Sequence, residues 1–472
     1  MRYPKILSLS VMLVASSVFA GGFVTNTNQS AHYVRGIARE ASTEVDAAYT
    51  NPAGTAFMKD GLHISINNQS FIQARSIKTE YALFENGKKE YEGDVFEPSM
   101  PSLFIVYNRG DLALSGGFYI VGGGGTIDYA DGFPSFEASL ATLPSLLSSA
   151  GVKGYSVDMS LTGTSYVMAL QLGASYKLFD RVSVYGGGRF NYSYSNYEGV
   201  LKNITLTMAD GSTIAAATYF NGASQQYAVA AEATEDPTLK ATYEAYAERF
   251  AGLAQSTADK ELECTQTGYG FTPILGLDFN YKRLNVGIKY EHKTEIDLEN
   301  DTQKNDFGAS LPTFADGYKS RGDLPAYLSV GIRYGFLDNF RATIGYHHFF
   351  DSYAHFSNNV QDELDHDENE YLLGMEFDMN DRITFSLGGA YTQIFATDES
   401  QNNLMFDMSS YSIGWGAAMR LSEHIRMNFG YFFTVYEDWE KEEENYGGSG
   451  LTAVTTYDRM SHGIGLGFDL DI

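Results

Sequence analysis

Histidine is the side chain that most often performs acid–base chemistry near neutral pH, and the sequence has one local histidine group, His347, His348 and His355. An enzyme would need one of them to meet a serine or an acidic side chain at a shared site. His347 and His348 are neighbours in an alternating segment, so their side chains are expected on opposite faces of a strand. The group does not predict a catalytic site, and we do not expect an enzyme.

The sequence has little else that would support cofactor or metal chemistry. The single cysteine, Cys264, cannot form an internal disulfide and does not resemble a metal motif. The acidic run 362–368 lies between strands, and we interpret it as a solvated loop, with a divalent-cation site as the alternative. No phosphate-binding or dinucleotide motif occurs. A net charge of −27 argues against nucleic acid as a partner. We expect no cofactor, no metal and no nucleic acid.

The dominant pattern is instead a period of two. In the clearest segment, Ile383, Phe385 and Leu387 alternate with Thr384 and Ser386. Many segments reach ten residues, the length that a tilted strand needs to cross a bilayer. The pattern predicts fourteen strands, near residues 62–77, 98–108, 111–128, 160–178, 181–203, 265–281, 284–299, 323–335, 339–353, 369–379, 382–395, 406–421, 424–438 and 457–471. The expected fold class is all-β, a transmembrane antiparallel β-barrel of about 14 strands.

The connections between these segments alternate in length. Six are short and polar: 108–111, 179–181, 282–283, 337–339, 380–382 and 422–424. Short turns at one end and long loops at the other are typical of outer-membrane barrels, with the short turns in the periplasm. An even number of strands closes the sheet and removes its edges. The expected location is the outer membrane of a Gram-negative bacterium, as a multi-pass β-barrel.

Composition and the N-terminus agree with this location. The chain has 34 Tyr and 31 Phe but 2 Trp, and 48 Gly, which suits strands, interface girdles and crowded sheets. Arg2 and Lys5 precede a short apolar run, Ile6–Val18, and Ala20 ends a small-residue cleavage site. We therefore expect residues 1–20 to be a signal peptide.

Three segments break the strand pattern. Around Asn51-Pro52-Ala53, the small and polar stretch Ser42–Phe57 cannot continue a sheet and should pack as a compact irregular piece. Gly122, Gly123, Gly124 and Gly125 lie inside the third strand, where they indicate a bulge or a close approach. A loop of helical turns carries six apolar residues, which either cap the barrel or present apolar surface: Phe133, Phe136, Leu140, Leu143, Leu146 and Leu147. In the longest connection, about 206–263, residues 238–255 should be helical.

Asn51-Pro52-Ala53, about thirty residues behind the leader and directly before the first strand, resembles the hatch signature of the FadL/TodX family. These are outer-membrane channels for long-chain fatty acids and other hydrophobic compounds. The strand count agrees with the family, and residues 273–277 and 324–331 resemble its strand openings. The chain end, with Phe468, Leu470 and Ile472 on one face, resembles the signal read by the barrel-assembly machinery, although a terminal Phe is commoner.

The resemblance implies a domain plan and a transport path. Residues 21–60 would form a hatch that plugs the lumen, and residues 61–472 the barrel with long extracellular loops. The apolar loop at Phe133–Leu147 would be a capture surface, and the glycine run a lateral opening for release into the membrane. The implied partners are a hydrophobic ligand (a fatty acid or hydrocarbon), outer-membrane lipid, lipopolysaccharide and the barrel-assembly machinery, with the chain acting as a monomer.

Alternation also places charged side chains in the lumen: Arg189, Asp278, Lys289, Glu291, Arg333, Arg341 and Arg426. Charges inside a barrel usually pair with each other or with the plug. One or two could instead hold a carboxylate head group.

The alternatives to a transporter are barrels of other kinds. A general diffusion porin would lack the roughly forty residues that precede the first strand here. A structural or adhesive outer-membrane barrel without transport activity is the second alternative. The sequence does not identify the ligand.

Overall fold

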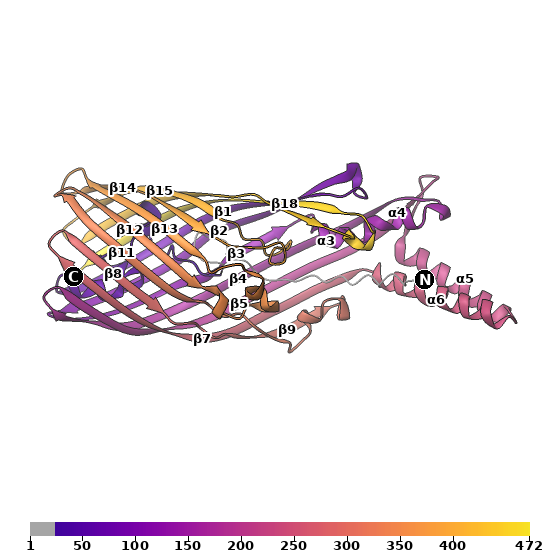
Figure 1. The fold of residues 1–472 in the computed structure, drawn as a ribbon, viewed down its shortest axis with the longest axis horizontal. Coiled ribbons are helices and arrows are strands. Elements are labelled where there is room, and N and C mark those ends of the chain that lie inside the picture. Colours follow the sequence, from indigo (N-terminus) through magenta and orange to yellow (C-terminus); the bar gives the residue numbers. More distant parts are fainter. Residues whose placement is uncertain (1–23) are drawn as a thin grey trace.

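The computed structural model describes residues 24–472, so the expected signal peptide at residues 1–20 lies outside the described residues, as do residues 21–23 of the expected hatch. The described chain forms one antiparallel sheet that closes into a barrel (Figure 1). The first strand, β1 (Gly61–Glu80), pairs on one side with β2 (Lys88–Arg109) and on the other with the last strand, β18 (Ala453–Asp471). Because the ends of the sheet meet, no edge is left along this seam.

Fourteen long strands form the wall, as the alternating pattern predicts. After β1 and β2, the wall strands are β3 (Leu112–Tyr129), β4 (Val152–Phe179), β5 (Val182–Met208), β7 (Lys260–Tyr281), β8 (Leu284–Glu291), β11 (Ala326–Leu337), β12 (Phe340–Phe350), β13 (Asn369–Asp378), β14 (Ile383–Gln393), β15 (Ser410–Arg420), β16 (Ile425–Tyr436) and β18. Four short strands add to the sheet outside this set: β6 (Thr213–Ala215), β9 (Asp297–Asn305), β10 (Lys319–Arg321) and β17 (Trp439–Glu443).

The six short connections lie together at one end of the barrel, as expected from the sequence. The C-terminus lies at the same end, at the left of Figure 1. There, the backbone N–H of Ile472 donates to the carbonyl oxygen of Leu62 at 2.8 Å. The long connections lie at the opposite end. This separation of short and long connections is the arrangement of membrane-spanning barrels.

The outer face of the wall carries a belt of exposed apolar side chains. These include Ile66, Ile105, Leu114, Leu172, Leu275, Ile344, Leu373, Phe385, Leu387, Phe429 and Leu466. A soluble chain rarely exposes so much contiguous apolar surface, whereas lipid tails would cover it. The belt therefore identifies a barrel that spans a membrane. In the described part of the chain, no helix is long and apolar enough to cross a membrane.

All helices after the first strand lie in the long connections. The loop after β3 has α3 (Pro134–Glu137), η3 (Leu140–Thr142), α4 (Leu143–Leu146) and η4 (Ser148–Ala150); other single turns are η2 (Glu85–Gly87), η5 (Gly308–Ser310), η6 (Pro312–Phe314), η7 (Asp351–Tyr353), η8 (Ser357–Glu363) and η9 (Tyr446–Gly448). A helical hairpin, α5 (Ala216–Ala233) and α6 (Pro237–Ser256), projects from the loop end of the barrel (Figure 1). The helix expected at 238–255 is confirmed as α6.

Aromatic packing holds the hairpin together. The ring of Tyr227 on α5 stacks on Phe250 of α6, with centroids 5.5 Å apart, and also contacts Tyr243 and Tyr246. Asp236 caps α6 by accepting the backbone N–H of Thr238 at 2.8 Å. The hairpin is thus a folded unit rather than a long structureless loop.

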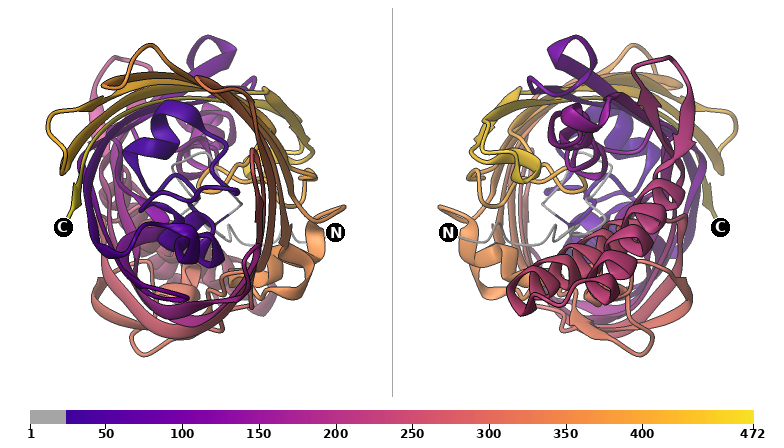
Figure 2. Two further views of the ribbon diagram at one scale, coloured as in Figure 1. Left: turned by 90° about the vertical axis from the view of Figure 1, so that its left-hand side faces the viewer. Right: turned by 90° about the vertical axis from the view of Figure 1, so that its right-hand side faces the viewer.

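Residues 24–57, called the N-terminal segment below, lie inside the barrel (Figure 2). They form α1 (Ala31–Gly36), α2 (Ala47–Thr50) and η1 (Pro52–Phe57). Helix α1 contacts β14, β15, β16 and β18. Inward-facing glycines make this approach possible: a Cβ on Gly388 would lie 2.3 Å from the carbonyl oxygen of Gly36, and one on Gly430 would lie 2.5 Å from the amide nitrogen of Arg35.

A buried aspartate makes one external loop sensitive to pH. Asp351 in η7 is buried, and its carboxylate accepts the backbone N–H of Glu368 at 3.1 Å. Burial raises the pKa of Asp351 from 3.8 to about 7, and repulsion from Asp367 and Asp407 adds to the increase. A pKa raised by folding means that the loop is most stable below pH 3.8, where the group is protonated in both states, and loses stability as the pH rises through about 7.

We therefore expect amide exchange in residues 351–368, corrected for intrinsic rates, to become faster between about pH 4 and about pH 7. Asp351→Asn should flatten this dependence, since it keeps an acceptor for Glu368 without the charge. An unchanged pH profile in the variant would show that Asp351 is not the titrating group. Hydrogen exchange read by mass spectrometry measures both.

Candidate functional site

The Asn51-Pro52-Ala53 motif is attached to the wall near the short turns. The side-chain amide of Asn51 donates to the carbonyl oxygen of Ser42 at 2.9 Å and to the carboxylate of Asp278 on β7. Asp278 also accepts from the amide of Asn285 on β8 at 2.8 Å. Asn51 thus links the fold of the N-terminal segment to two neighbouring strands.

The backbone of the same motif is held from the other side. The carbonyl oxygens of Pro52 and Ala53 accept from the hydroxyls of Ser175 on β4 and Ser183 on β5, each at 2.6 Å. Pro52 begins η1, where its missing N–H costs no hydrogen bond. Three wall strands, β4, β5 and β7, therefore hold the motif directly, and it is a point of attachment in this conformation.

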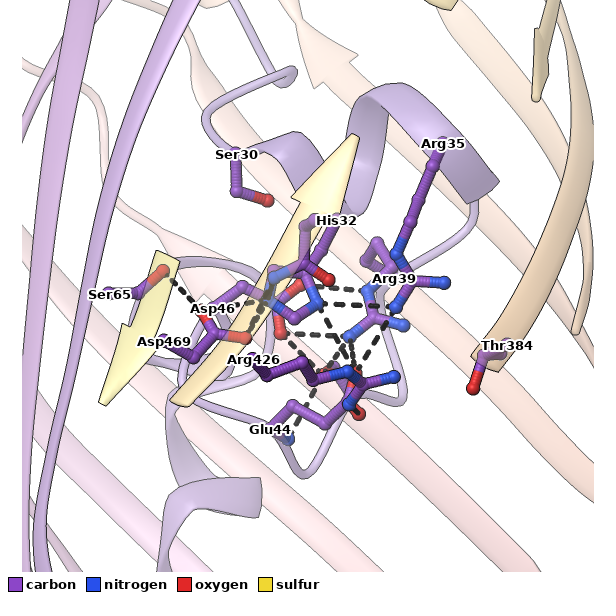
Figure 3. A network of polar contacts seen from close by, with 12 residues as sticks. Ser30, His32, Arg35, Arg39, Glu44, Asp46, Ser65, Thr384, Arg426 and Asp469 are labelled. Atoms are coloured by element: carbon purple, nitrogen blue, oxygen red, sulfur yellow. Dashed lines mark hydrogen bonds and ion pairs between the residues drawn. The ribbon is translucent and has the colours of Figure 1, made fainter. Parts of the chain in front are cut away.

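A buried ionic network organises the segment itself (Figure 3). The guanidinium of Arg39 forms two parallel hydrogen bonds to the carboxylate of Asp46, Nε to Oδ2 at 2.7 Å and Nη2 to Oδ1 at 2.9 Å. Arg39 also binds Glu44 at 2.6 Å, and Ser42 donates to Asp46 at 2.8 Å. Bidentate pairs of this kind are the strongest ion pairs in proteins when the surroundings satisfy them.

Further pairs join the segment to the wall. These are His32 Nε2 to Asp469 Oδ2 at 2.9 Å, Arg35 Nη1 to Glu376 Oε1 at 2.7 Å, and Arg426 Nη1 to Glu44 Oε1 at 2.5 Å. They reach strands β13, β16 and β18. Together with Asn51, they hold the segment on opposite sides of the lumen.

Three of these residues, His32, Glu44 and Asp46, form the one group in residues 24–472 with the spacing of a metal site. Burial alone would lower the pKa of His32, but the carboxylates of Asp469 and Asp46 raise it to about 9. His32 is therefore protonated at neutral pH, and a protonated imidazole does not bind a metal. Arg39 already occupies both carboxylates. The group is better described as part of the ionic network.

The glycine run lies at an interruption in the wall. Strands β2 and β3 pair at Val95–Ile127 and again at Leu103–Phe118, and across the described residues between these points, 96–102 and 119–126, the two strands form no pairs. Gly123 and Gly125 have φ values of +72° and +97°, which glycine adopts without strain. The pairing of β3 with β4 shifts register at the same place. The run therefore bends β3 away from β2, as a bulge does.

The N-terminal segment crosses this interruption on the inside. Its contacts with the two strand edges are Asn26 N to Val121 O at 2.7 Å, Asn26 Nδ2 to Gly123 O at 2.7 Å, Gln29 Nε2 to Ile120 O at 2.9 Å, and Ser102 Oγ to Gln29 O at 2.6 Å. Backbone groups of β3 that β2 leaves without ladder partners are thus satisfied by Asn26 and Gln29. Movement of these few residues would uncover the interruption.

A small cavity and an apolar cluster adjoin the interruption. The cavity is lined by Asn26, Asn28, Gln29, Gln69, Phe71, Met100, Pro101 and Ile120. The cluster, called the lumen cluster below, consists of Val34, Phe71, Val95, Met100, Ile120 and Phe432. Among the buried apolar clusters inside the barrel, this one adjoins the interruption, and a hydrophobic molecule could use such a surface for binding.

Solved structures with the same architecture are known, although no protein-family model and no curated protein matches the sequence. A Pseudomonas aeruginosa FadL homologue superposes with a TM-score of 0.63 at 14% identity, over 97% of this chain and 100% of that one. The Pseudomonas putida toluene transporter TodX gives 0.55 at 14% identity, over 93% and 97%. The Ralstonia pickettii toluene transporter TbuX gives 0.50 at 16% identity, over 90% and 93%.

The chain has the FadL/TodX fold. The resemblance seen in the sequence is thereby confirmed at the level of the fold, and it extends over nearly the whole chain. Of these three structures, two are named as toluene transporters and one as a FadL homologue.

The apolar loop of this FadL/TodX barrel does not form a single exposed surface. Phe133, Phe136, Leu140 and Leu143 are buried in a large aromatic and aliphatic cluster under the external loops. Leu146 is 60% exposed, and the neighbouring Leu147 is partly exposed. The sequence left two alternatives for this loop, a cap on the barrel or an exposed apolar surface. In this conformation the four buried residues pack as a cap. Only Leu146 and Leu147 are exposed enough in this conformation to contribute to the predicted capture surface.

The inward charges pair as the sequence predicts. Arg189 and Lys289 both bind Glu291, at 2.7 Å and 2.8 Å. Arg341 binds Glu376 at 2.7 Å. The others reach the N-terminal segment: Arg333 donates to Thr43, Arg426 to Glu44, and Asp278 accepts from Asn51.

The histidine group does not form a shared site. His347 points into the lumen, where it contacts Glu370 at 2.6 Å and Glu40 at 3.0 Å. His348 lies on the other face and contacts Asn369. Alternation predicts this separation of His347 and His348, and His347 pairs with carboxylates of the wall and of the N-terminal segment.

Sequence reasoning missed the residues that bridge the interruption. Asn26 and Gln29 belong to a run of short polar residues, Thr25–Ser30, that precedes α1. The only signal was that every residue of this run can donate or accept hydrogen bonds, which suits a strand edge without a partner. Their partners could not be inferred, because the interruption depends on pairing between distant strands.

Proposed function

We propose that this protein is a passive channel for hydrophobic small molecules in the outer membrane of a Gram-negative bacterium. The single observation that carries the proposal is the interruption in the pairing of β2 with β3, which lies beside a buried apolar cluster in the lumen. The fold shared with a FadL homologue and with toluene transporters supports it. The ligand class is long-chain fatty acids or aromatic hydrocarbons.

A hydrophobic ligand faces a specific barrier at the cell surface. Each methylene favours leaving water by about 0.8 kcal/mol, so a water-filled pore would not carry a long chain efficiently. A path that leads from an apolar lumen sideways into the bilayer avoids this barrier. No motif for nucleotide binding or hydrolysis accompanies the barrel, so the gradient of the ligand would drive uptake.

The proposed path has three stages. Ligand is first captured at the loop end, where Leu146 and Leu147 offer apolar surface and the four buried loop residues would contribute if the cap opened. It then reaches the lumen cluster. Finally, the plug moves; we assign the plug to residues 21–60, which include the N-terminal segment, and the barrel to residues 61–472. The plug shifts at Asn26 and Gln29, and the ligand leaves near Gly122–Gly125 into the outer leaflet.

The Asn51-Pro52-Ala53 motif would serve as the fixed end of this movement. Its hydrogen bonds to β4, β5 and β7, away from the interruption, support an anchor role, whereas Asn26 and Gln29 bind only the two strands that border the interruption, β2 and β3. A plug that is anchored at one end and mobile at the other can open a side path without leaving the barrel. Outer-membrane lipid and lipopolysaccharide would surround the belt, and assembly would use the C-terminal strand.

The alternative is a structural or adhesive barrel without transport. The test is uptake of labelled long-chain fatty acid and labelled toluene by intact Gram-negative cells that lack their own channel for these probes, with and without this protein. Heat-modifiable migration on gels controls for barrel assembly. Uptake of either probe above the background supports the channel. Assembled protein with no uptake of either probe would overturn the proposal in favour of the structural barrel.

A further inference from the structure

A tyrosine on the membrane side of the wall reaches a carboxylate on the lumen side. On β4, Tyr166 shares its face with Leu170 and Leu172, which are exposed on the outer belt. On β2, Glu97 is directly opposite Phe71 of the lumen cluster in the pairing register, so its side chain faces inward. The hydroxyl of Tyr166 donates to Oε2 of Glu97 at 2.6 Å. This hydrogen bond therefore joins the two faces of the wall.

The contact is possible because β3 bends at the glycine run. Strand β3 lies between β2 and β4, and strands two places apart in a sheet are separated by about 10 Å. Tyr166 is opposite Gly123 in the register of β3 with β4, and a Cβ on Gly125 would lie 2.5 Å from Oε2 of Glu97. A side chain at Gly125 would thus displace the carboxylate. The glycine run leaves the room in which β4 reaches β2 across β3.

The tyrosine ring occupies the side of the interruption that faces the membrane. Tyr166 and Met168 both belong to the outward face of β4, yet both pack against the lumen cluster, as does Ile127 of β3. An outward side chain can reach this cluster only where the wall is interrupted. Asn26 and Gln29 cover the interruption from the lumen. In this conformation the interruption is therefore closed on both sides.

The edge of β2 at the interruption is satisfied without β3. Pro98 and Pro101 have no backbone N–H, and proline is tolerated at sheet edges for this reason. The backbone N–H of Ser99 donates to Oε1 of Glu97 at 3.4 Å, and the hydroxyl of Ser70 donates to the carbonyl oxygen of Pro98 at 2.7 Å. Because these groups have local partners, a shift of the plug gives β2 no reason to pair with β3. The interruption then stays, and side chains decide whether its outer side is open.

We propose that Tyr166 is an outer gate of the interruption and that its hydrogen bond to Glu97 is the latch that keeps the gate closed. This inference rests on the proposed function and adds a second barrier, on the membrane side, to the plug. Rotation of the Tyr166 side chain toward the lipid would uncover the lumen cluster. Tyrosine suits such a movement, since its ring is apolar and its hydroxyl finds polar partners near the head groups.

The test measures how fast a cysteine in the lumen cluster reacts with a reagent that arrives from the membrane. Met100→Cys is made in the full-length protein together with Cys264→Ser, which removes the native thiol. This parent protein is reconstituted into phosphatidylcholine vesicles that contain N-phenylmaleimide, a lipid-soluble thiol reagent. We expect Tyr166→Phe to speed the labelling about tenfold, the usual effect of losing a hydrogen bond to a carboxylate. Tyr166→Ala should speed it further, because the ring is lost as well.

Three comparisons separate the latch from a general loosening of the wall. Glu97→Gln keeps an acceptor for the tyrosine hydroxyl and should label at close to the parent rate, whereas Glu97→Ala should match Tyr166→Phe. Tyr346→Phe is the matched control and should leave the rate unchanged, since Tyr346 donates to Asn369 at 2.6 Å on the outer face of β12. A charged methanethiosulfonate reagent added to the water should react at one rate with the cysteine in all these proteins.

The outcomes separate this inference from the proposed function. Equal labelling by N-phenylmaleimide in the parent and in both Tyr166 variants would overturn the gate. Equal acceleration of both reagents would also overturn it, because that result indicates local unfolding. Labelling does not depend on transport, so faster labelling of a protein that gives cells no uptake would leave the outer closure standing and refute the proposed function. Uptake by the wild type with no change of labelling in the variants would refute this inference alone.

Discussion

Ile120→Trp is expected to lower fatty acid uptake by about 5- to 150-fold while the barrel still assembles, the range that follows from an overpacking cost of about 1–3 kcal/mol on the path. Ile120 belongs to the lumen cluster, lines the cavity, and is on the edge of β3 that faces the interruption. A larger ring there would fill the route between lumen and membrane. Unlike a replacement at Gly123, it imposes no strain on a backbone with positive φ. Uptake of labelled fatty acid by intact cells is the measurement.

Ile344→Trp is the matched control. It makes the same substitution on β12, where the side chain of Ile344 is exposed on the outer belt, far from the interruption. Tryptophan is well tolerated on such a surface. Equal uptake by the two variants and the wild type would show that the ligand leaves by another route, with the N-terminal segment as the next candidate. Reduced uptake in both variants would point to a general assembly defect.

Asp46→Ala has the second large expected effect, release of the N-terminal segment. Asp46 is fully buried and holds Arg39 by two hydrogen bonds. Removing one partner of a buried ion pair costs about 3–5 kcal/mol when the other charge is left unpaired, and the cost here should lie toward the lower end because Arg39 keeps its contact with Glu44. The barrel wall does not contain this pair and should survive. We expect protease cleavage within residues 24–57 and a rise in ion conductance across planar bilayers.

Asp338→Ala provides the comparison for this variant. Asp338 forms an ion pair with Arg283 at an exposed turn, and such pairs contribute little to stability. The variant should match the wild type in proteolysis and conductance. If Asp46→Ala resisted proteolysis and conducted ions no more than Asp338→Ala, the ionic network would not hold the N-terminal segment in place. The contacts of Asn51 with the wall would then be the main candidates for that role.

The strand plan was accessible from the sequence because alternation is local. Ile383, Phe385 and Leu387 face lipid and their neighbours face the lumen, and this pattern repeats in most wall strands. Several strand boundaries differ from those expected, and two of the differences have clear physical reasons. Strand β2 begins at Lys88, ten residues before the expected start. The prediction began at Pro98 because Pro98 and Pro101 normally interrupt a strand, whereas β2 continues through both. The segment 284–299 is interrupted after Glu291, and its second part forms β9 against β7.

The site was less accessible, because its contacts join residues far apart in the chain. The glycine run indicated a bulge, but the missing pairs between β2 and β3 depend on the register of both strands. The ion pairs of Arg35 with Glu376 and of His32 with Asp469 span most of the sequence. Helix α5 was also missed, since its Ala, Gln and Tyr residues form no clear apolar stripe.

The pairing of β1 with β18, which extends from His63 to Glu80, imposes an order on biogenesis. The first wall strand cannot find its last neighbour until the entire chain has been synthesised and translocated, so ring closure is necessarily a late event with a large loop to close. Helix α1 contacts β14, β15, β16 and β18, all from the final quarter of the chain. The N-terminal segment therefore cannot complete its contacts with the wall until these strands have formed. Closure of the ring and formation of these contacts of the N-terminal segment therefore both belong to the last stage of assembly.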